Sequence, residues 1–123
     1  FARNICMDQR KVVRLTNKNS ELIGKCVTAL REIFARYDLD KDGALNEEEL
    51  DNFANGCNGT DTGFSADEKR QIKENFELDE LGNLTENGFL QMYSLQTMSE
   101  PSETWKDLKA HGYDVYLKLT TNQ

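Results

Sequence analysis

Apolar residues recur at steps of three and four along residues 20–37, which is the spacing of one face of an α-helix. Asn19 or Ser20 stands just before the apolar stripe and is a suitable N-cap, because its side-chain oxygen can accept from a free backbone N–H. The stripe consists of Leu22, Ile23, Cys26, Val27, Leu30, Ile33, Phe34 and Tyr37. The pattern therefore predicts an amphipathic helix ending near residue 37.

A second short apolar stripe follows after a polar interval. Residues 47–54 place Leu50 and Phe53 on one helical face, and Gly56 stands where a helix commonly ends. The two stretches predict a helix–loop–helix unit. Such a unit leaves its apolar faces exposed when alone, so a second unit is expected to pack against it.

The remaining chain supplies this second unit. After the polar, Gly-rich linker at residues 55–63, Ser65 and Glu68 have the spacing of a capping box at the start of a helix. Ile72 and Phe76 give this helix its apolar side. Thr85 can cap a further helix whose apolar residues are Phe89, Leu90, Met92, Tyr93 and Leu95.

A last helical stretch begins near Pro101, a residue suited to the first turn of a helix, and ends near Gly112. Trp105 and Leu108 lie three apart on it. The stretch either closes the core as a fifth helix or fills a groove of the paired units through a Trp105 anchor. His111 beside Gly112 is interpreted as a helix-end residue, since no second His or nearby Cys joins it.

The polar interval between the first two helices, residues 38–49, reads DLDKDGALNEEE. Oxygen donors recur at alternate positions, Gly43 is sixth, and a two-oxygen carboxylate is twelfth, which is the spacing of an EF-hand calcium loop. Asn46 at position nine would act directly or through a water. The expected metal ligands are Asp38, Asp40, Asp42, the backbone carbonyl of Ala44, and Glu49. Ca²⁺ is the expected ion, and Mg²⁺ is a candidate at rest.

The interval at residues 77–88 can be laid over the first loop, but Leu81 and Gly88 fall at positions five and twelve, where oxygen donors are required. We therefore predict a degenerate, metal-free partner loop. In that alignment Leu45 and Leu84 both occupy position eight. They are expected to face each other in a short two-stranded bridge.

Composition narrows the class of protein. Residues 1–19 carry a net charge of +4, which leaves −11 for residues 20–123, so the predicted helical part is a poor candidate for nucleic-acid binding. Apolar runs are too short for membrane insertion. The single His has no Ser or Cys in a recognisable catalytic arrangement, so we predict no enzyme activity in this sequence. The cysteines Cys6, Cys26 and Cys57 are odd in number and lack C-x-x-C spacing, which favours a reducing, intracellular compartment.

These patterns predict an all-α fold containing a paired EF-hand, one calcium-competent and one degenerate, with a C-terminal helix packed on it. The expected division is a basic N-terminal arm at 1–19, the EF-hand pair at 20–97, and a C-terminal helix and tail at 98–123. The alternative to a calcium loop at residues 38–49 is a run of acidic residues on a solvated face. The full spacing of the loop, together with the flanking helices, argues against that alternative.

Several segments carry a more specific resemblance. They are Lys25-Cys26-Val27-Thr28-Ala29-Leu30-Arg31-Glu32-Ile33-Phe34, Gly43-Ala44-Leu45-Asn46, Gly82-Asn83-Leu84-Thr85-Glu86-Asn87-Gly88-Phe89-Leu90, Glu103-Thr104-Trp105-Lys106-Asp107-Leu108 and Gly112-Tyr113-Asp114. With Glu49-Leu50, they resemble the first EF-hand unit of the Miro GTPases over about residues 22–117. The resemblance implies a calcium-competent EF-hand, a hidden one, and a following helix that occupies the groove as a ligand mimic. It also implies a cytosol-facing location, such as the outer mitochondrial membrane.

Two classes of function follow. The favoured one is a calcium-binding regulatory module of a larger intracellular protein, in which calcium in the 38–49 loop controls a groove of this chain that binds a protein partner. The alternative is a protein-interaction scaffold in which the metal is a static structural staple. Since no Gly-rich phosphate loop occurs, nucleotide chemistry such as a GTPase would lie outside this sequence.

Overall fold

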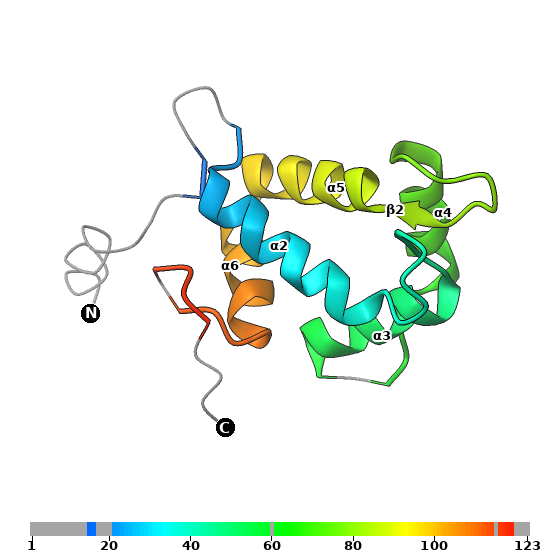
Figure 1. The fold of residues 1–123 in the computed structure, drawn as a ribbon, viewed down its shortest axis with the longest axis horizontal. Coiled ribbons are helices and arrows are strands. Elements are labelled where there is room, and N and C mark those ends of the chain that lie inside the picture. The colour runs from blue at the N-terminus through cyan, green and yellow to red at the C-terminus, as the bar shows by residue number, and fades with distance from the viewer. Residues whose placement is uncertain (1–14, 17–20, 60, 115, 120–123) are drawn as a thin grey trace.

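Five helices and one small sheet make up the computed structural model, which describes residues 15–16, 21–59, 61–114 and 116–119 (Figure 1). The helices are α2 (Gly24–Tyr37), α3 (Glu47–Asn58), α4 (Ala66–Asn75), α5 (Glu86–Ser99) and α6 (Pro101–Ala110). The strands are β1 (Ala44–Leu45) and β2 (Leu84–Thr85). The predicted all-α fold is confirmed, because each strand has only two residues.

The two interhelical loops meet in the antiparallel pair β1–β2. Leu45 lies opposite Leu84, and Ala44 lies opposite Thr85. Both leucine side chains are buried, so the β1–β2 pair packs against the hydrophobic core. The predicted pairing of Leu45 with Leu84 is confirmed, and it fixes the positions of the two loops relative to each other.

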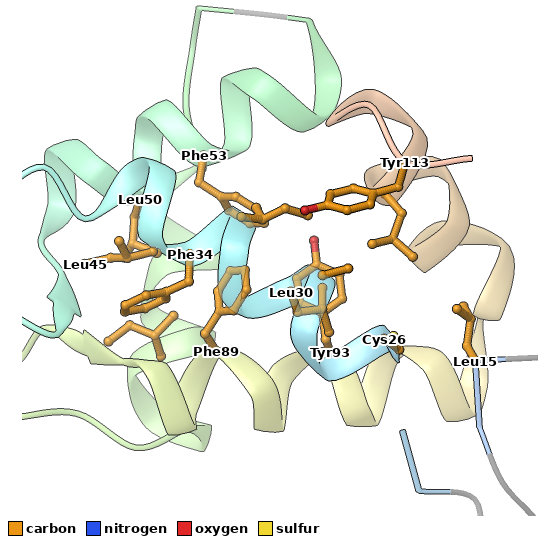
Figure 2. Packing of buried hydrophobic residues seen from close by; sticks show 14 of the residues in the cluster. Leu15, Cys26, Leu30, Phe34, Leu45, Leu50, Phe53, Phe89, Tyr93 and Tyr113 are labelled. Atoms are coloured by element: carbon orange, nitrogen blue, oxygen red, sulfur yellow. The ribbon is translucent and has the colours of Figure 1, made fainter. Parts of the chain in front are cut away.

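The core lies between α2, α3 and α5, where aromatic rings meet edge to face (Figure 2). The ring centroids of Phe34 and Phe89 are 5.4 Å apart, and those of Phe53 and Phe89 are 5.1 Å apart. Such offset arrangements add favourable electrostatics to the burial of apolar area. The amphipathic stripe predicted for the first helix supplies Cys26, Leu30, Ile33 and Phe34 to this core.

Local hydrogen bonds define where three helices begin. The capping box of Ser65 and Glu68 is confirmed, with Glu68 N donating to Ser65 Oγ at 3.1 Å and Ser65 N donating to Glu68 Oε1 at 2.9 Å. Asn46 and Glu49 form a second capping box at α3. Thr85 caps α5 by accepting from Gly88 N at 3.0 Å. Each side chain satisfies a backbone group that has no partner within its helix.

Two predicted helix boundaries differ from the structure. α3 runs on to Asn58 and ends at Gly59, whose φ of 67° is the left-handed value that glycine adopts readily, so Gly56 lies within the helix. α2 begins at Gly24 with Ile23 as N-cap and no side-chain cap. Asn19 and Ser20, the predicted caps, lie outside the described residues.

α6 packs against α5 and α3, with Thr104 and Leu108 fully buried. Trp105, the expected anchor of this helix, is only half-buried. The face that α6 turns toward the core is centred on Thr104 and Leu108 instead. A pair of buried hydroxyls, Thr97 Oγ1 and Thr104 Oγ1, lies 2.7 Å apart between α5 and α6. His111 is the C-cap of α6, which confirms its interpretation as a helix-end residue.

The segment after α6 turns back onto α2. Tyr113 and Leu117 are buried in the same core as the apolar residues of α2, α3 and α5. The Tyr113 hydroxyl donates to a carboxylate oxygen of Glu32. Leu15, from the predicted N-terminal arm, also belongs to this core. The expected division at residues 19 and 97 stays a prediction.

Two further predictions concern cysteines and membranes. Cys26 is buried and Cys57 half-buried, and both are free thiols, whereas Cys6 lies outside the described residues. Burial raises the pKa of Cys26 to about 11, so this thiol is un-ionised at neutral pH. In the described part of the chain, every helix is too short or too polar to cross a lipid bilayer.

Candidate metal centre

Three elements bring the side chains of the first loop together. Asp38 is the C-cap of α2, β1 follows Gly43, and Glu49 lies in the first turn of α3. Asp38, Asp40, Asp42 and Glu49 each offer one carboxylate oxygen, and these atoms all lie within 4.8 Å of one another. The structure thus gathers the four carboxylates that the spacing of the sequence picked out.

Backbone N–H groups of the loop hold the aspartates in place. Asp38 Oδ2 accepts from Gly43 N at 3.0 Å, and Asp38 Oδ1 accepts from Asp42 N at 3.3 Å. Asp42 Oδ1 in turn accepts from Ala44 N at 3.1 Å. Hydrogen bonds to a charged acceptor are stronger than neutral ones, so these bonds keep the carboxylates oriented despite their mutual repulsion.

Glu49 reaches back across the loop from α3. Its Oε2 accepts from Leu39 N at 2.9 Å, and its Oε1 accepts from Asn46 N at 3.0 Å. Its side chain is buried, as is that of Asp38, while Asp40 and Asp42 are exposed. Both oxygens of Glu49 are therefore held at the loop interior, which suits a two-oxygen donor to a cation.

The loop backbone bends sharply at two residues. Gly43 has a φ of 87° and Lys41 a φ of 56°. The first value strains any residue with a Cβ, which explains glycine at the sixth position. Lys41 adopts the left-handed region as a non-glycine residue, and this conformation turns the chain between Asp40 and Asp42.

The pKa values of the exposed aspartates diverge. Partial desolvation and the hydrogen-bonded carboxyl of Asp42 raise the pKa of Asp40, whereas the backbone N–H of Ala44 lowers the pKa of Asp42. Like charges in one small loop resist ionising together, and a divalent cation relieves that repulsion. All the donors are hard oxygens, which are the ligands that Ca²⁺ takes. The residues present therefore fit a bound Ca²⁺.

Ala44 was predicted to contribute its backbone carbonyl. It is buried and lies in β1 opposite Thr85. Its role as a ligand stays a prediction, and so does the ligand set as a whole. Leu39 was missed by the sequence analysis: its contribution is a backbone N–H to Glu49, which no side-chain pattern reveals.

The second loop is closed upon itself. A Cβ on Gly88 would overlap the backbone carbonyl oxygen of Glu77 and lie 2.7 Å from Leu84 Cδ1, so there is no room for a twelfth-position side chain. Asp79 Oδ1 accepts from Leu81 N at 2.9 Å, and the Leu81 side chain is 81% exposed. Within the described residues, no second cluster of three or more potential metal ligands occurs. That the second loop binds no metal stays a prediction.

Comparison with known proteins gives one family match. Residues 27–94 match the family described as an EF-hand domain pair. This range covers both loops and most of the helices that flank them.

Curated proteins add several relatives. The chain is 36% identical over 101 residues to the probable mitochondrial Rho GTPase gemA of Dictyostelium discoideum, a match covering 76% of this chain and 15% of that protein. It is 35% identical over 97 residues to mitochondrial Rho GTPase 2 of Arabidopsis thaliana, covering 79% of this chain and 14% of the relative. For EF-hand calcium-binding domain-containing protein 7 of Xenopus laevis, identity is 30% over 116 residues, with coverages of 92% and 18%. The chain spans less than a fifth of the length of each of these relatives.

Proposed function

This chain belongs to the EF-hand domain-pair family and is similar to the mitochondrial Rho GTPases, the Miro family that its sequence resembles, and from that premise we propose that it is a calcium-binding regulatory module. One Ca²⁺ binds in the loop from Asp38 to Glu49, held by Asp38, Asp40, Asp42, Glu49 and the Ala44 carbonyl. Mg²⁺ is the competing ion at rest. The second loop stays metal-free and serves as the structural partner of the first.

The gathering of four carboxylates within 4.8 Å carries this proposal. In the absence of a cation the loop must hold four negative charges together, and a divalent cation removes that repulsion. Because Asp38 ends α2 and Glu49 begins α3, a cation that both residues bind fixes the ends of these helices relative to each other. Calcium thereby acts on the angle between α2 and α3.

We place the regulated surface where α6 packs on the EF-hand pair. α6 packs on both α3 and α5, and a cavity of about 210 Å³ remains beside it. Its lining combines apolar residues, such as Phe53 and Met92, with charged ones, such as Glu103 and Lys106. Calcium that alters the angle between α2 and α3 would change how tightly α6 fits. The occupant favoured by an altered groove is a protein partner, in the helix-in-groove manner.

The alternative is a protein-interaction scaffold with a static metal. It draws support from the polar contacts of α6, since Thr104 is fully buried with its hydroxyl 2.7 Å from that of Thr97. The Tyr93 hydroxyl also donates to Asp107 Oδ2 at 2.7 Å. Buried polar pairs fix one register and are costly to separate, so they favour a helix that does not leave.

We extend the proposal to the whole protein only in outline. The relatives named mitochondrial Rho GTPases suggest a larger protein on the cytosolic face of an organelle such as the outer mitochondrial membrane. Any GTPase activity then lies outside this sequence. The strongly acidic residues 20–123 favour a protein partner over a nucleic acid.

Calcium binding is tested by isothermal titration calorimetry of the chelator-treated protein. Wild type should bind one Ca²⁺, and Asp38→Asn should weaken binding by about 100-fold or more, equivalent to about 2.7 kcal/mol. Asp79→Asn, at the third position of the second loop, is the matched control and should bind like wild type. Unimpaired binding by Asp38→Asn would refute the assignment. A parallel Mg²⁺ titration reports the competing ion.

The regulatory and static readings differ in conformation. Trp105 is the single tryptophan of the chain and lies on α6, so its fluorescence reports the surroundings of that helix. The regulatory proposal expects calcium to change Trp105 emission and the binding of a hydrophobic dye, with Asp38→Asn as control. If calorimetry shows binding while both optical readings stay constant, the static scaffold is the correct function.

A further inference from the structure

His111 joins the end of α6 to both helices of the first EF-hand. Its ring stacks on Phe53 of α3, with centroids 5.9 Å apart and an interplanar angle of 14°. Its Nε2 lies 2.8 Å from the hydroxyl oxygen of Tyr37, the last residue of α2. Arg36 Nη1 donates to the His111 carbonyl oxygen at 2.9 Å. One residue thus contacts α2 and α3 immediately beside the metal loop.

The protonation state of this ring follows from its partners. Nδ1 lies 2.8 Å from the carbonyl oxygen of Asp107, which can only accept, so Nδ1 carries the proton. In the neutral ring Nε2 then has a free lone pair and accepts from the Tyr37 hydroxyl. The arrangement is that of a neutral imidazole with both nitrogens satisfied.

A second proton would enter a poor environment. The His111 side chain is buried, and the guanidinium of Arg36 adds a like charge from α2. Protonation at Nε2 would also force the Tyr37 hydroxyl to turn and accept instead of donate. A buried cation without a dedicated acceptor is unfavourable, so protonation opposes the observed packing.

Titratable groups on α3 and α6 also affect the pKa of His111 or lie close to its partners. α3 contributes Cys57, which is near Tyr37, and burial and the Asp107 charge raise the pKa of its thiol to about 12, so it stays neutral. α6 contributes Asp107, whose carboxylate attracts a proton to His111, although it accepts from the Tyr93 hydroxyl of α5. Burial is the largest influence and lowers the pKa of His111, the Asp107 carbonyl opposes this, and Arg36 adds to the lowering.

We propose that His111 is a pH-sensitive latch: its neutral ring holds the end of α6 on Tyr37 and Phe53, and its protonation releases that end from the first EF-hand. The inference goes beyond calcium binding and does not require it. A neutral buried ring favours folding when the unfolded residue is also neutral, above about pH 6.5. The stabilisation is lost as the pH falls below 6.5 toward the lower value in the folded protein.

The chain contains one histidine, which makes the test direct. In chelator, the C-ε1 proton of His111 is followed by NMR from pH 8 to 5, together with Trp105 emission. We expect the ring to titrate below its ordinary value and Trp105 emission to shift to the red over the same pH interval. A ring that titrates at or above 6.5, or emission that does not follow the titration, would overturn the proposal.

Two variants separate the latch from general acid effects. His111→Gln removes the titrating group, and the red shift below pH 6.5 should disappear. Tyr37→Phe removes the donor to Nε2 and should move the His111 titration to higher pH. If His111→Gln does not fold, the wild-type and Tyr37→Phe titrations decide the matter on their own: equal midpoints refute the latch. Calcium affinity enters none of these measurements.

Discussion

Gly56 offers a sharp test of how α2, α3 and α6 fit together. It lies inside α3, where replacing glycine by alanine normally stabilises a helix by about 1 kcal/mol. A Cβ at this position would come closer than 3.0 Å to the Tyr37 hydroxyl oxygen and within 3.1 Å of His111 Nε2. The Gly56→Ala variant should therefore be less stable than wild type, against the intrinsic preference of the helix.

The expected magnitude follows from three contributions. Overpacking at a well-filled site costs about 1 to 3 kcal/mol. Displacing Tyr37 removes its hydrogen bond to the buried His111, a loss of about 1 kcal/mol. The helical preference of alanine offsets about 1 kcal/mol. The net effect should be a loss of about 2 kcal/mol of unfolding free energy, which for a domain of this size lowers the melting temperature by roughly 10 °C.

Urea unfolding in the presence of a chelator measures this loss of unfolding free energy. The slope of the unfolding free energy against urea concentration should be the same for variant and wild type. In a Tyr37→Phe background the obstructing oxygen is gone, while His111 Nε2 at 3.1 Å and the ring carbon at 3.2 Å remain tight contacts. This residual crowding should offset the helical preference of alanine, so Gly56→Ala should be neutral within about 0.5 kcal/mol. Gly24→Ala is the matched control, since a Cβ there meets nothing within 4 Å. A Gly56→Ala variant that is more stable than wild type would refute the packing described.

Substitutions at three further positions probe the loops, each by thermal unfolding in the presence of a chelator. Leu45→Ala should cost about 2 to 5 kcal/mol, because the side chain is fully buried in the bridge between the loops; a loss below 1 kcal/mol would contradict that burial. Asn46→Ala removes the capping box with Glu49 and should cost about 1 kcal/mol, whereas Asn46→Ser, which keeps a capping oxygen, should recover most of it. Gly88→Ala should destabilise by about 1 to 3 kcal/mol, because its Cβ would overlap the carbonyl of Glu77; a stability gain would show that the second loop has more room than described.

Features with local causes were predictable from the sequence. The capping box at Ser65, the turn at Gly43 and the alternating carboxylates each depend on residues a few positions apart, where backbone geometry leaves little choice. The pairing of Leu45 with Leu84 also followed, because two loops aligned on their glycines place these residues in register. The fold class and the candidate metal centre came from such local rules.

Features that depend on tertiary contacts were not predictable in the same way. Gly56 looked like a helix end, but it allows the close approach of Tyr37, and that contact comes from another helix. Trp105 looked like the anchor of α6, yet rotation of the helix turns Thr104 and Leu108 inward. The role of His111 required the positions of three helices. Helical periodicity identifies a face only to within a residue and does not say which partner covers it.

We propose that one calcium ion binds in the loop from Asp38 to Glu49 while the second loop binds none. Amide NMR shifts followed during a calcium titration test it most directly, since every loop residue reports separately. The amide shifts of residues 38–49 should saturate at one equivalent of calcium, and those of residues 77–88 should change only along the same curve, through the β1–β2 bridge. Saturation at two equivalents, or a separate curve for residues 77–88, would contradict it.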